Sequence, residues 1–241
     1  MAENKELNQL EDSNIVIEKA KDFWAKYSKK IIYIGAAVIL LSAGWMGYQK
    51  FIVEPNEQKA NEMIFLAEKV FDQMATTSFS KDSVSIALNG GTLEGANVIG
   101  LLKVINTYGS TLAANRARYM VGASYLQLKE FDKSIKYLKD FEGHGADQVQ
   151  SKAYLMLGHA YAEKNQTDEA LSYYKKASSV NKKDESVTPD ALMIAASYAA
   201  KIGKTEDAIE LFKNLKENYA TYISVSNGDV EKQLARLGEF N

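Results

Sequence analysis

The chain has 241 residues, a formal net charge of −2 and no cysteine. With 29 Lys and Arg residues against 31 Asp and Glu residues, it lacks the basic excess that marks nucleic-acid-binding proteins. The lack of cysteine excludes disulfide bonds, thiolate metal sites and cysteine nucleophiles. Only two prolines occur, Pro55 and Pro189, which favours a chain built almost entirely of helices.

Residues 31–49, with the sequence IIYIGAAVILLSAGWMGYQ, contain no charged side chain. As a helix this stretch spans roughly 28 Å, which matches the hydrocarbon core of a bilayer. Aromatic side chains stand near both ends, where an interfacial belt is expected, and the candidate anchors are Trp24, Tyr27, Trp45 and Tyr48. The pattern predicts a membrane-spanning helix within residues 31–53. The alternative is a buried core helix, but no other segment is apolar enough to cover it on every face.

The apolar run starts only at Ile31 and no small-residue cleavage site follows it, which favours an uncleaved anchor over a signal peptide. Basic residues are concentrated before the span, at Lys19, Lys21, Lys26, Lys29 and Lys30, whereas only Lys50 and Lys59 follow it closely. The positive-inside rule then predicts a cytoplasmic N-terminus, with the rest of the chain in the periplasm of a bacterial inner membrane.

Residues 1–30 are expected to form a cytoplasmic tail followed by an amphipathic helix. Residues 1–13 are polar, acidic and aperiodic, as in disordered tails, and the apolar stripe begins after Asn14. The alternative is that this segment only extends the spanning helix. Within the span, Ala36, Ala43 and Gly47 share one face and would let another helix approach closely, although spans without a partner have similar compositions.

Residues 54–114 are expected to hold juxtamembrane helices. Apolar residues at helical spacing predict one helix over 56–74. Further helices are expected over 80–88 and 96–108, with a turn at residues 89–91, and together they would form a degenerate first repeat.

Residues 151–180 follow a helix–turn–helix pattern with small and large residues at fixed positions. Tyr154, Leu157, Gly158 and Tyr161 fill the first helix, and Ala170, Tyr174 and Ala177 fill the second. The small residues Gly158 and Ala170 are expected where the two helices approach most closely. This pattern resembles the tetratricopeptide repeat, in which two short antiparallel helices need neighbouring repeats to cover them. Residues 115–148 and 189–222 repeat it, with Phe141 where alanine is usual, and residues 223–241 would contribute a closing helix.

The predicted fold is therefore all-α, with a single N-terminal transmembrane helix followed by a tetratricopeptide-repeat α-solenoid over 115–222. The two histidines, His144 and His159, have no second ligand at metal spacing, and no phosphate-binding glycine loop occurs. These observations predict a non-enzymatic protein without a cofactor, a metal, a nucleic-acid partner or a small-molecule substrate.

The concave groove of the repeats is the surface expected to carry function. The groove positions of the repeat pattern are occupied here by Arg116, Tyr119, Leu126, Gln127, Lys152, Leu155, His159, Glu163, Met193, Ser197 and Lys201. The fifth position of each repeat is apolar, which suits apolar or extended segments of a partner. The alternative is that neighbouring helices bury these side chains.

The N-terminal segment also resembles the YfgM-like family, an ancillary subunit of the bacterial Sec translocon. The shared features are Glu18, Lys21, Phe23–Trp24, Lys30, Gly35, Gly44–Trp45, Tyr48 and the turn at residues 106–109. With the repeats, the resemblance covers roughly residues 14–215, and the tyrosine- and lysine-rich repeats look like those of Bacteroidota. This chain is longer, chiefly through 76–95 and its C-terminal segment.

The resemblance implies an inner-membrane protein whose periplasmic repeats meet secreted chains leaving the translocon, together with a periplasmic chaperone. The expected partners are membrane lipid, Sec translocon subunits, that chaperone and secreted clients. The alternative function is a structural scaffold for another envelope complex, in division or outer-membrane assembly.

Overall fold

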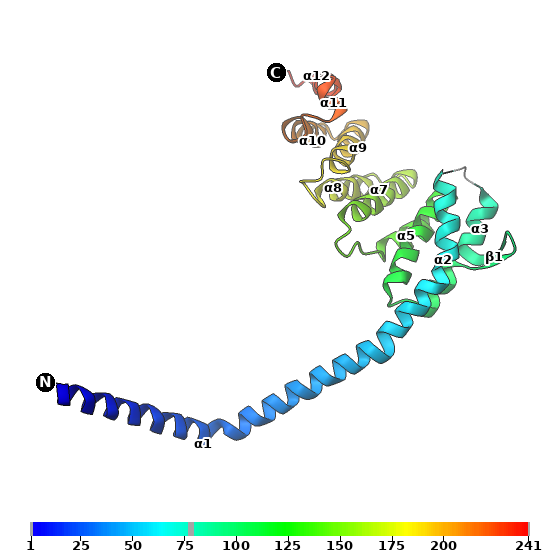
Figure 1. Ribbon diagram of the computed structural model, residues 1–241. Helices are drawn as coiled ribbons and strands as arrows, with labels where there is room; N and C mark the ends of the chain where they lie inside the picture. Colours follow the sequence, from blue (N-terminus) through cyan, green and yellow to red (C-terminus); the bar gives the residue numbers. More distant parts are fainter. Residues whose placement is uncertain (1, 77–79, 241) are drawn as a thin grey trace. The chain divides into compact units, whose positions relative to one another are not determined.

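The computed structural model describes residues 2–76 and 80–240, and the side chains of residues 17–73 and 80–240 (Figure 1). The chain divides into two compact units, Met1–Pro55 and Asn56–Asn241. The first unit is a single run of helix, and the second contains the remaining helices and one small sheet.

The first unit consists of helix α1 (Ala2–Tyr48) and the π-helical turn η1 (Gln49–Val53). The helical stretch Ile17–Gln73 contains a window with mean hydropathy 1.8, none of which is buried, so it is long and apolar enough to cross a membrane. A core helix would be mostly buried, which this window is not. Helix α1 runs without a break from Ala2, so the backbone follows the extension alternative rather than a disordered tail and a separate amphipathic helix.

The π-helical turn lies directly before Pro55. The N–H of Glu54 donates to the carbonyl of Gln49, five residues back rather than four. A proline inside a helix has no N–H to donate and its ring collides with the carbonyl four residues earlier. A locally wider turn moves that carbonyl aside, which lets the helix continue into α2 (Glu54–Thr76).

The second unit begins with α2, followed by α3 (Lys81–Asn89), a hairpin of β1 (Gly90–Leu93) and β2 (Ala96–Ile99), and α4 (Leu101–Tyr108). The strands pair antiparallel, with Gly90 opposite Ile99 and Leu93 opposite Ala96. The expectation of one helix over 96–108 was therefore wrong for residues 96–100, and the tight turn lies at Glu94–Gly95 rather than at 89–91.

Backbone geometry explains the hairpin. Glu94 and Gly95 both have positive φ, 51° and 81°, as the tight primed turns between antiparallel strands require. A Cβ on Gly100 would lie 2.3 Å from the carbonyl carbon of Asn89, so only glycine lets the two ends of the hairpin meet there. Because the turn has Glu94 where Asn or Asp is usual, the sequence does not show the common signal for a hairpin turn.

Three helix pairs follow in chain order and stack side by side (Figure 1). They are α5 (Leu112–Gln127) with α6 (Phe131–Lys139), α7 (Asp147–Glu163) with α8 (Thr167–Ser179), and α9 (Thr188–Lys201) with α10 (Thr205–Asn218). The short helices α11 (Ile223–Ser226) and α12 (Asp229–Arg236) complete the unit. The predicted all-α fold class, with one apolar N-terminal helix before a helical repeat array, is confirmed.

The first two pairs each close at a glycine in their first helix. A Cβ on Gly122 would lie 2.5 Å from Leu138, and one on Gly158 would lie 2.4 Å from the Tyr174 ring, so no larger residue fits without displacement. The hydroxyl of Ser134 also donates to the carbonyl of Gly122 at 2.8 Å. The close approach at Gly158 is where the sequence predicts it.

Two apolar clusters form the interior of the second unit. The N-terminal core joins α2, α3, β2, α4 and α5 through fully buried side chains that include Ile64, Leu101 and Val104. The repeat core runs from α6 to α12 through Leu157, Phe212 and Leu234 among others. Helix α12 contributes buried apolar side chains to this cluster, and its role as a closing helix stays a prediction.

Candidate functional site

The predicted groove residues lie on the first helix of each pair, α5, α7 and α9. Four of them, Tyr119, Leu126, Leu155 and Met193, are half-buried. The others are exposed, and these are Arg116, Gln127, Lys152, His159, Glu163, Ser197 and Lys201. Half-buried apolar side chains between exposed polar ones are the arrangement expected of a surface that binds a polypeptide.

A pocket of about 400 Å³ lies between α5 and α7. It brings together four of the predicted groove residues, Leu126, Gln127, His159 and Glu163. Lys129 and Phe131, in and after the turn between α5 and α6, complete its lining and were missed from sequence because turn residues stand outside the groove positions. The lining of the pocket includes hydrogen-bond donors and acceptors as well as the apolar side chains of Leu126 and Phe131.

His159 is held on one side by Tyr174. The Nδ1 atom of His159 lies 2.8 Å from the Tyr174 hydroxyl, and the two rings meet edge to face with centroids 5.3 Å apart. Although His159 keeps an exposed edge, partial desolvation of its ring lowers its pKa below the usual range, and the nearby charge of Glu163 opposes this only in part. Burial likewise raises the pKa of Tyr174. A neutral imidazole therefore faces the pocket at neutral pH.

At the N-terminal end of the groove, helix α2 engages Arg116. The Nε atom of Arg116 donates to Glu68 Oε1 at 2.9 Å, and Nη2 donates to Asn61 Oδ1 at 2.8 Å. Glu57 on the same helix accepts from the backbone N–H groups of Leu112 and Ala113 at the start of α5, at 2.7 and 3.0 Å. Two of the hydrogen bonds that the Arg116 guanidinium donates therefore go to side chains of α2 in the same chain.

Tyr119 opens onto a second pocket, of about 370 Å³. The lining residues are Glu68, Phe71, Asp72, Arg116, Tyr119, Met120, Phe141 and Val149. The α2 residues were missed from sequence because that helix lies outside the repeats. The unusual phenylalanine at position 141 was the one signal that could have pointed to this pocket.

At the C-terminal end, Leu155 and Met193 pack partly against the repeat core. This placement agrees in part with the alternative that neighbouring helices cover them. Asp190 at the start of α9 accepts a hydrogen bond from the Tyr222 hydroxyl at 2.7 Å, and burial and this bond raise the pKa of Tyr222 to about 12. The segment after α10 therefore contacts the edge of the predicted groove.

Comparison with known protein families gives matches for each of the three helix pairs. Residues 116–141 and 151–184 match one tetratricopeptide repeat family, and residues 190–222 match a second. The chain contains tetratricopeptide repeats. None of the curated protein sequences matches the chain. Tetratricopeptide repeats are protein–protein interaction modules and typically non-catalytic, and no enzyme family is indicated.

Ion pairs join the second helix of one tetratricopeptide repeat to the second helix of the next, or to the turn just before it. Lys164 pairs with Asp132 between repeats one and two, and Lys204 pairs with Asp168 between repeats two and three. A further pair, Lys175 Nζ to Asp207 Oδ1 at 2.7 Å, crosses the same junction as Lys204 and Asp168. The first two pairs are exposed and the third is half-buried. Exposed pairs contribute to orientation more than to stability.

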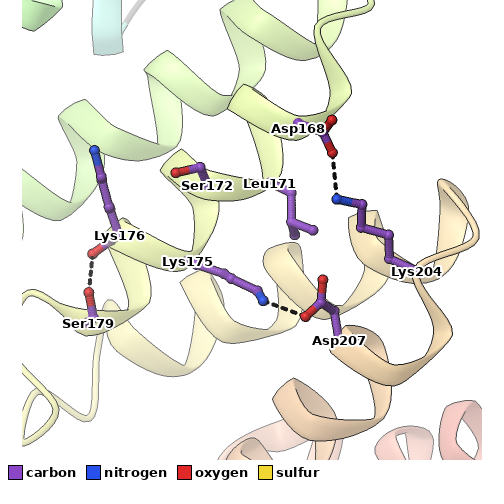
Figure 2. A pocket seen from close by; sticks show the side chains of 8 residues that line it. All are labelled: Asp168, Leu171, Ser172, Lys175, Lys176, Ser179, Lys204 and Asp207. Atoms are coloured by element: carbon purple, nitrogen blue, oxygen red, sulfur yellow. Dashed lines mark hydrogen bonds and ion pairs between the residues drawn. The ribbon is translucent and has the colours of Figure 1, made fainter.

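The pairs Lys204–Asp168 and Lys175–Asp207 cross a depression between α8 and α10 (Figure 2), whose volume is about 520 Å³. Its lining residues are Asp168, Leu171, Ser172, Lys175, Lys176, Ser179, Lys204 and Asp207. Two of its three lysines point to aspartates of the neighbouring repeat, so the depression serves to join repeats and does not gather cations for a ligand.

The residues predicted to act at the membrane all lie on α1. Ala36, Ala43, Trp24, Trp45 and Tyr48 are exposed, whereas Tyr27 and Gly47 are half-exposed. Tyr48 lies near Trp45, with ring centroids 6.3 Å apart. Helix packing at the small residues and interfacial anchoring at the aromatic ones stay predictions.

Within residues 17–73 and 80–240, no group of three His, Asp or Glu side chains could hold a metal ion.

Proposed function

We propose that this protein is a bacterial inner-membrane adaptor of the Sec translocon, whose periplasmic repeats bind emerging secreted proteins or a partner chaperone. The observation that carries the proposal is the face of α5, α7 and α9. Half-buried Tyr119, Leu155 and Met193 lie there among exposed polar side chains, next to the pocket at His159. Such a face binds partly apolar, extended segments without strict sequence demands.

The long apolar helix supports the membrane part of the proposal. Its span would keep the repeats next to the site where chains emerge, and Ala43 would contact a translocon helix. Membrane lipid surrounds the span in this arrangement, and the concentration of lysines before it keeps the N-terminus in the cytoplasm.

Site-specific photocrosslinking of the full chain in intact membranes tests both halves of the proposal. A probe at Ala43 should give a product with a translocon subunit, and a probe at Leu41 on the opposite side of the helix should give much less. A probe at Met193 should give a broad smear of clients, whereas one at Ser172 on the second-helix face should not.

Discrete products with other envelope proteins at both Ala43 and Met193 would overturn the translocon proposal. That outcome would favour the scaffold function instead. Replacement of Leu155 and Met193 together by Glu should abolish client capture, with Ser172→Glu as the matched control, because a buried charge opposes apolar contact.

A further inference from the structure

Residues 19–30 of α1, which we call the lysine segment, lie directly before the apolar run that begins at Ile31. The segment contains five lysines, and all five side chains are exposed. Asp22 is its one acidic residue, and Glu18 directly precedes it. By contrast, residues 50–62 on the other side of the apolar run contain two lysines and three glutamates. Positive charge is therefore concentrated at one end of the run.

The charge of the lysine segment is not neutralised within the chain. Within residues 17–73 and 80–240, no ion pair joins any of its five lysines to a carboxylate. The Nζ atom of Lys26 lies over the Tyr27 ring, 5.5 Å from its centroid, a contact that leaves the ammonium group charged. An anion can therefore bind to these lysines without breaking an ion pair first.

Helix geometry places three of these lysines at the depth of lipid headgroups. Helix α1 runs without a break across the edge of the apolar run, so each residue adds about 1.5 Å along one axis. Lys26, Lys29 and Lys30 therefore lie within roughly 8 Å of Ile31. The headgroup layer outside the hydrocarbon core is roughly 5–8 Å thick, and Tyr27 lies at the same depth, as interfacial aromatic residues do.

The nearby carboxylates lie farther out along the same helix. Asp22 and Glu18 are roughly 14 and 20 Å from Ile31, beyond the headgroup layer. Asp12 is roughly 28 Å from Ile31, and a charge so distant is screened at physiological salt, where the Debye length is roughly 8 Å. The headgroup layer therefore meets lysines and not carboxylates at this end of the helix.

We propose that the lysine segment binds anionic phospholipid headgroups, with Lys26, Lys29 and Lys30 at the lipid phosphates. The occupant follows from the position, because headgroups surround the end of any helix that spans a bilayer. Each ammonium group donates charge-assisted hydrogen bonds to phosphate oxygens, and one lysine near the surface favours an anionic lipid by roughly fivefold. This inference rests on the membrane-spanning part of the proposed function and requires neither the translocon nor a particular orientation.

The test measures which lipids stay bound to the full chain in nanodiscs. The discs contain equal amounts of phosphatidylglycerol and phosphatidylcholine with the same acyl chains, so the two lipids differ only in their headgroups. Native mass spectrometry of the released chain counts the bound molecules of each lipid. We expect roughly fivefold more phosphatidylglycerol than phosphatidylcholine, the effect of one lysine on one lipid. The ratio should fall as salt is added, because the lysines are exposed.

Two variants with the same change in charge locate the site. The first removes three charges from the lysine segment and should bring the lipid ratio close to one. The second removes three charges from exposed positions of α6 and should keep the ratio of the parent chain. The substitutions are Lys26→Gln, Lys29→Gln and Lys30→Gln in the first variant, and Lys133→Gln, Lys136→Gln and Lys139→Gln in the second.

A competitor separates a lipid site from a site for free phosphate. Soluble glycerol phosphate in excess should leave the ratio unchanged, because the bilayer holds the lipid headgroups beside the lysines. Displacement of phosphatidylglycerol by this competitor would overturn the proposal. Equal counts of the two lipids on the parent chain would also overturn it, and so would a preference that the first variant keeps or that the second variant loses.

The outcomes separate this inference from the proposed function. Both leaflets of a nanodisc have the same composition, so the lipid ratio does not depend on which way the chain is inserted. Equal lipid counts together with a translocon product at Ala43 would overturn this inference alone. A clear lipid preference without a translocon product would overturn the translocon role alone.

Discussion

The repeat array and the N-terminal core of the second unit both bury the apolar faces of helices, but they do so through different kinds of contact. In the repeats, the first two helix pairs close at Gly122 and Gly158, and neighbouring pairs are joined by similar lysine–aspartate pairs. In the N-terminal core, the closing contacts join residues far apart in the chain: Glu57 and Leu112 are 55 residues apart, and Glu68 and Arg116 are 48 apart.

The difference shows where stability and specificity reside. An array of repeats gains its stability from contacts between neighbours, so damage at one repeat spreads to the next. A region closed by long-range contacts depends on a few side chains that hold α2 in place. We therefore expect mutations in the repeat core to have the largest effects on stability, and mutations of exposed or half-buried α2 residues that contact α5 to have smaller and more local effects.

The largest effect is expected from Phe212→Ala in the repeat core. Phe212 is 1% exposed, and truncation of a buried phenylalanine lowers the free energy of unfolding by about 4 kcal/mol. Urea unfolding of the full chain in detergent, followed by circular dichroism, measures this. Phe240→Ala, at a side chain that is 80% exposed, is the control and should change little. Hydrogen exchange should rise in α7–α10 more than in α2–α4; a uniform rise would mean that the two regions unfold as one.

A second prediction concerns the close helix contact of repeat two. Gly158→Ala places a methyl group against the Tyr174 ring, which is 3% exposed and held by His159, so it should cost about 2 kcal/mol of stability. Gly122→Ala should act in the same direction, because Leu138 lies as close. Ser197→Ala on the exposed side of α9 is the control. If Gly158→Ala were as stable as the parent chain, the two helices of a repeat could move apart without loss of stability, and the prediction would be wrong.

For the N-terminal region, Glu57→Ala removes the carboxylate that accepts from the first N–H groups of α5. Loss of such a cap should cost about 1 kcal/mol and should speed hydrogen exchange at Leu112 and Ala113. Glu62→Ala, at an exposed position on the same helix, is the control. Unchanged exchange at those two amides would mean that α2 does not brace the first repeat.

A smaller effect, in this case an increase in stability, is expected at the turns between the two helices of each repeat. The central turn residue has positive φ in all three, 61° at Lys129, 58° at Asn165 and 78° at Gly203. Lysine is strained in this conformation and glycine is not, so Lys129→Gly should raise the free energy of unfolding by about 0.5 kcal/mol. Asn165→Gly should gain less, because asparagine tolerates this region better. A loss of stability in Lys129→Gly would indicate that its side chain has a role in the adjacent pocket.

The smallest expected effect is a pH dependence from repeat two. Partial burial holds the pKa of His159 below its usual range, so the unfolded chain takes up a proton at a higher pH than the folded chain does. Stability should therefore fall as the pH is lowered through about 6.5 and should level off above it. His159→Gln should flatten this part of the profile, as measured by thermal unfolding across pH 5–8. A profile unchanged by the substitution would assign the slope to other groups.

The sequence by itself determined the apolar helix, the three repeats and their close contact at Gly158, because these depend on local periodicity. A charge-free run long enough to span a bilayer, and small and large residues at fixed spacing, need no knowledge of distant contacts. The groove residues around His159 were predicted from repeat positions, and the structure brings four of them into one pocket. That a partner binds there stays a prediction.

Only the tertiary structure decided the hairpin of residues 90–99, the engagement of Arg116 by α2, and the pocket between Phe71 and Phe141. The turn of the hairpin has Glu94 where Asn or Asp is usual, so the sequence does not show the common turn signal. The close backbone approach at Gly100 cannot be read from the spacing of residues along the chain. The other two depend on residues at least 48 positions apart in the pairing of α2 with α5. Such contacts form because packing of the whole unit brings the segments together, and no periodicity along the chain encodes them.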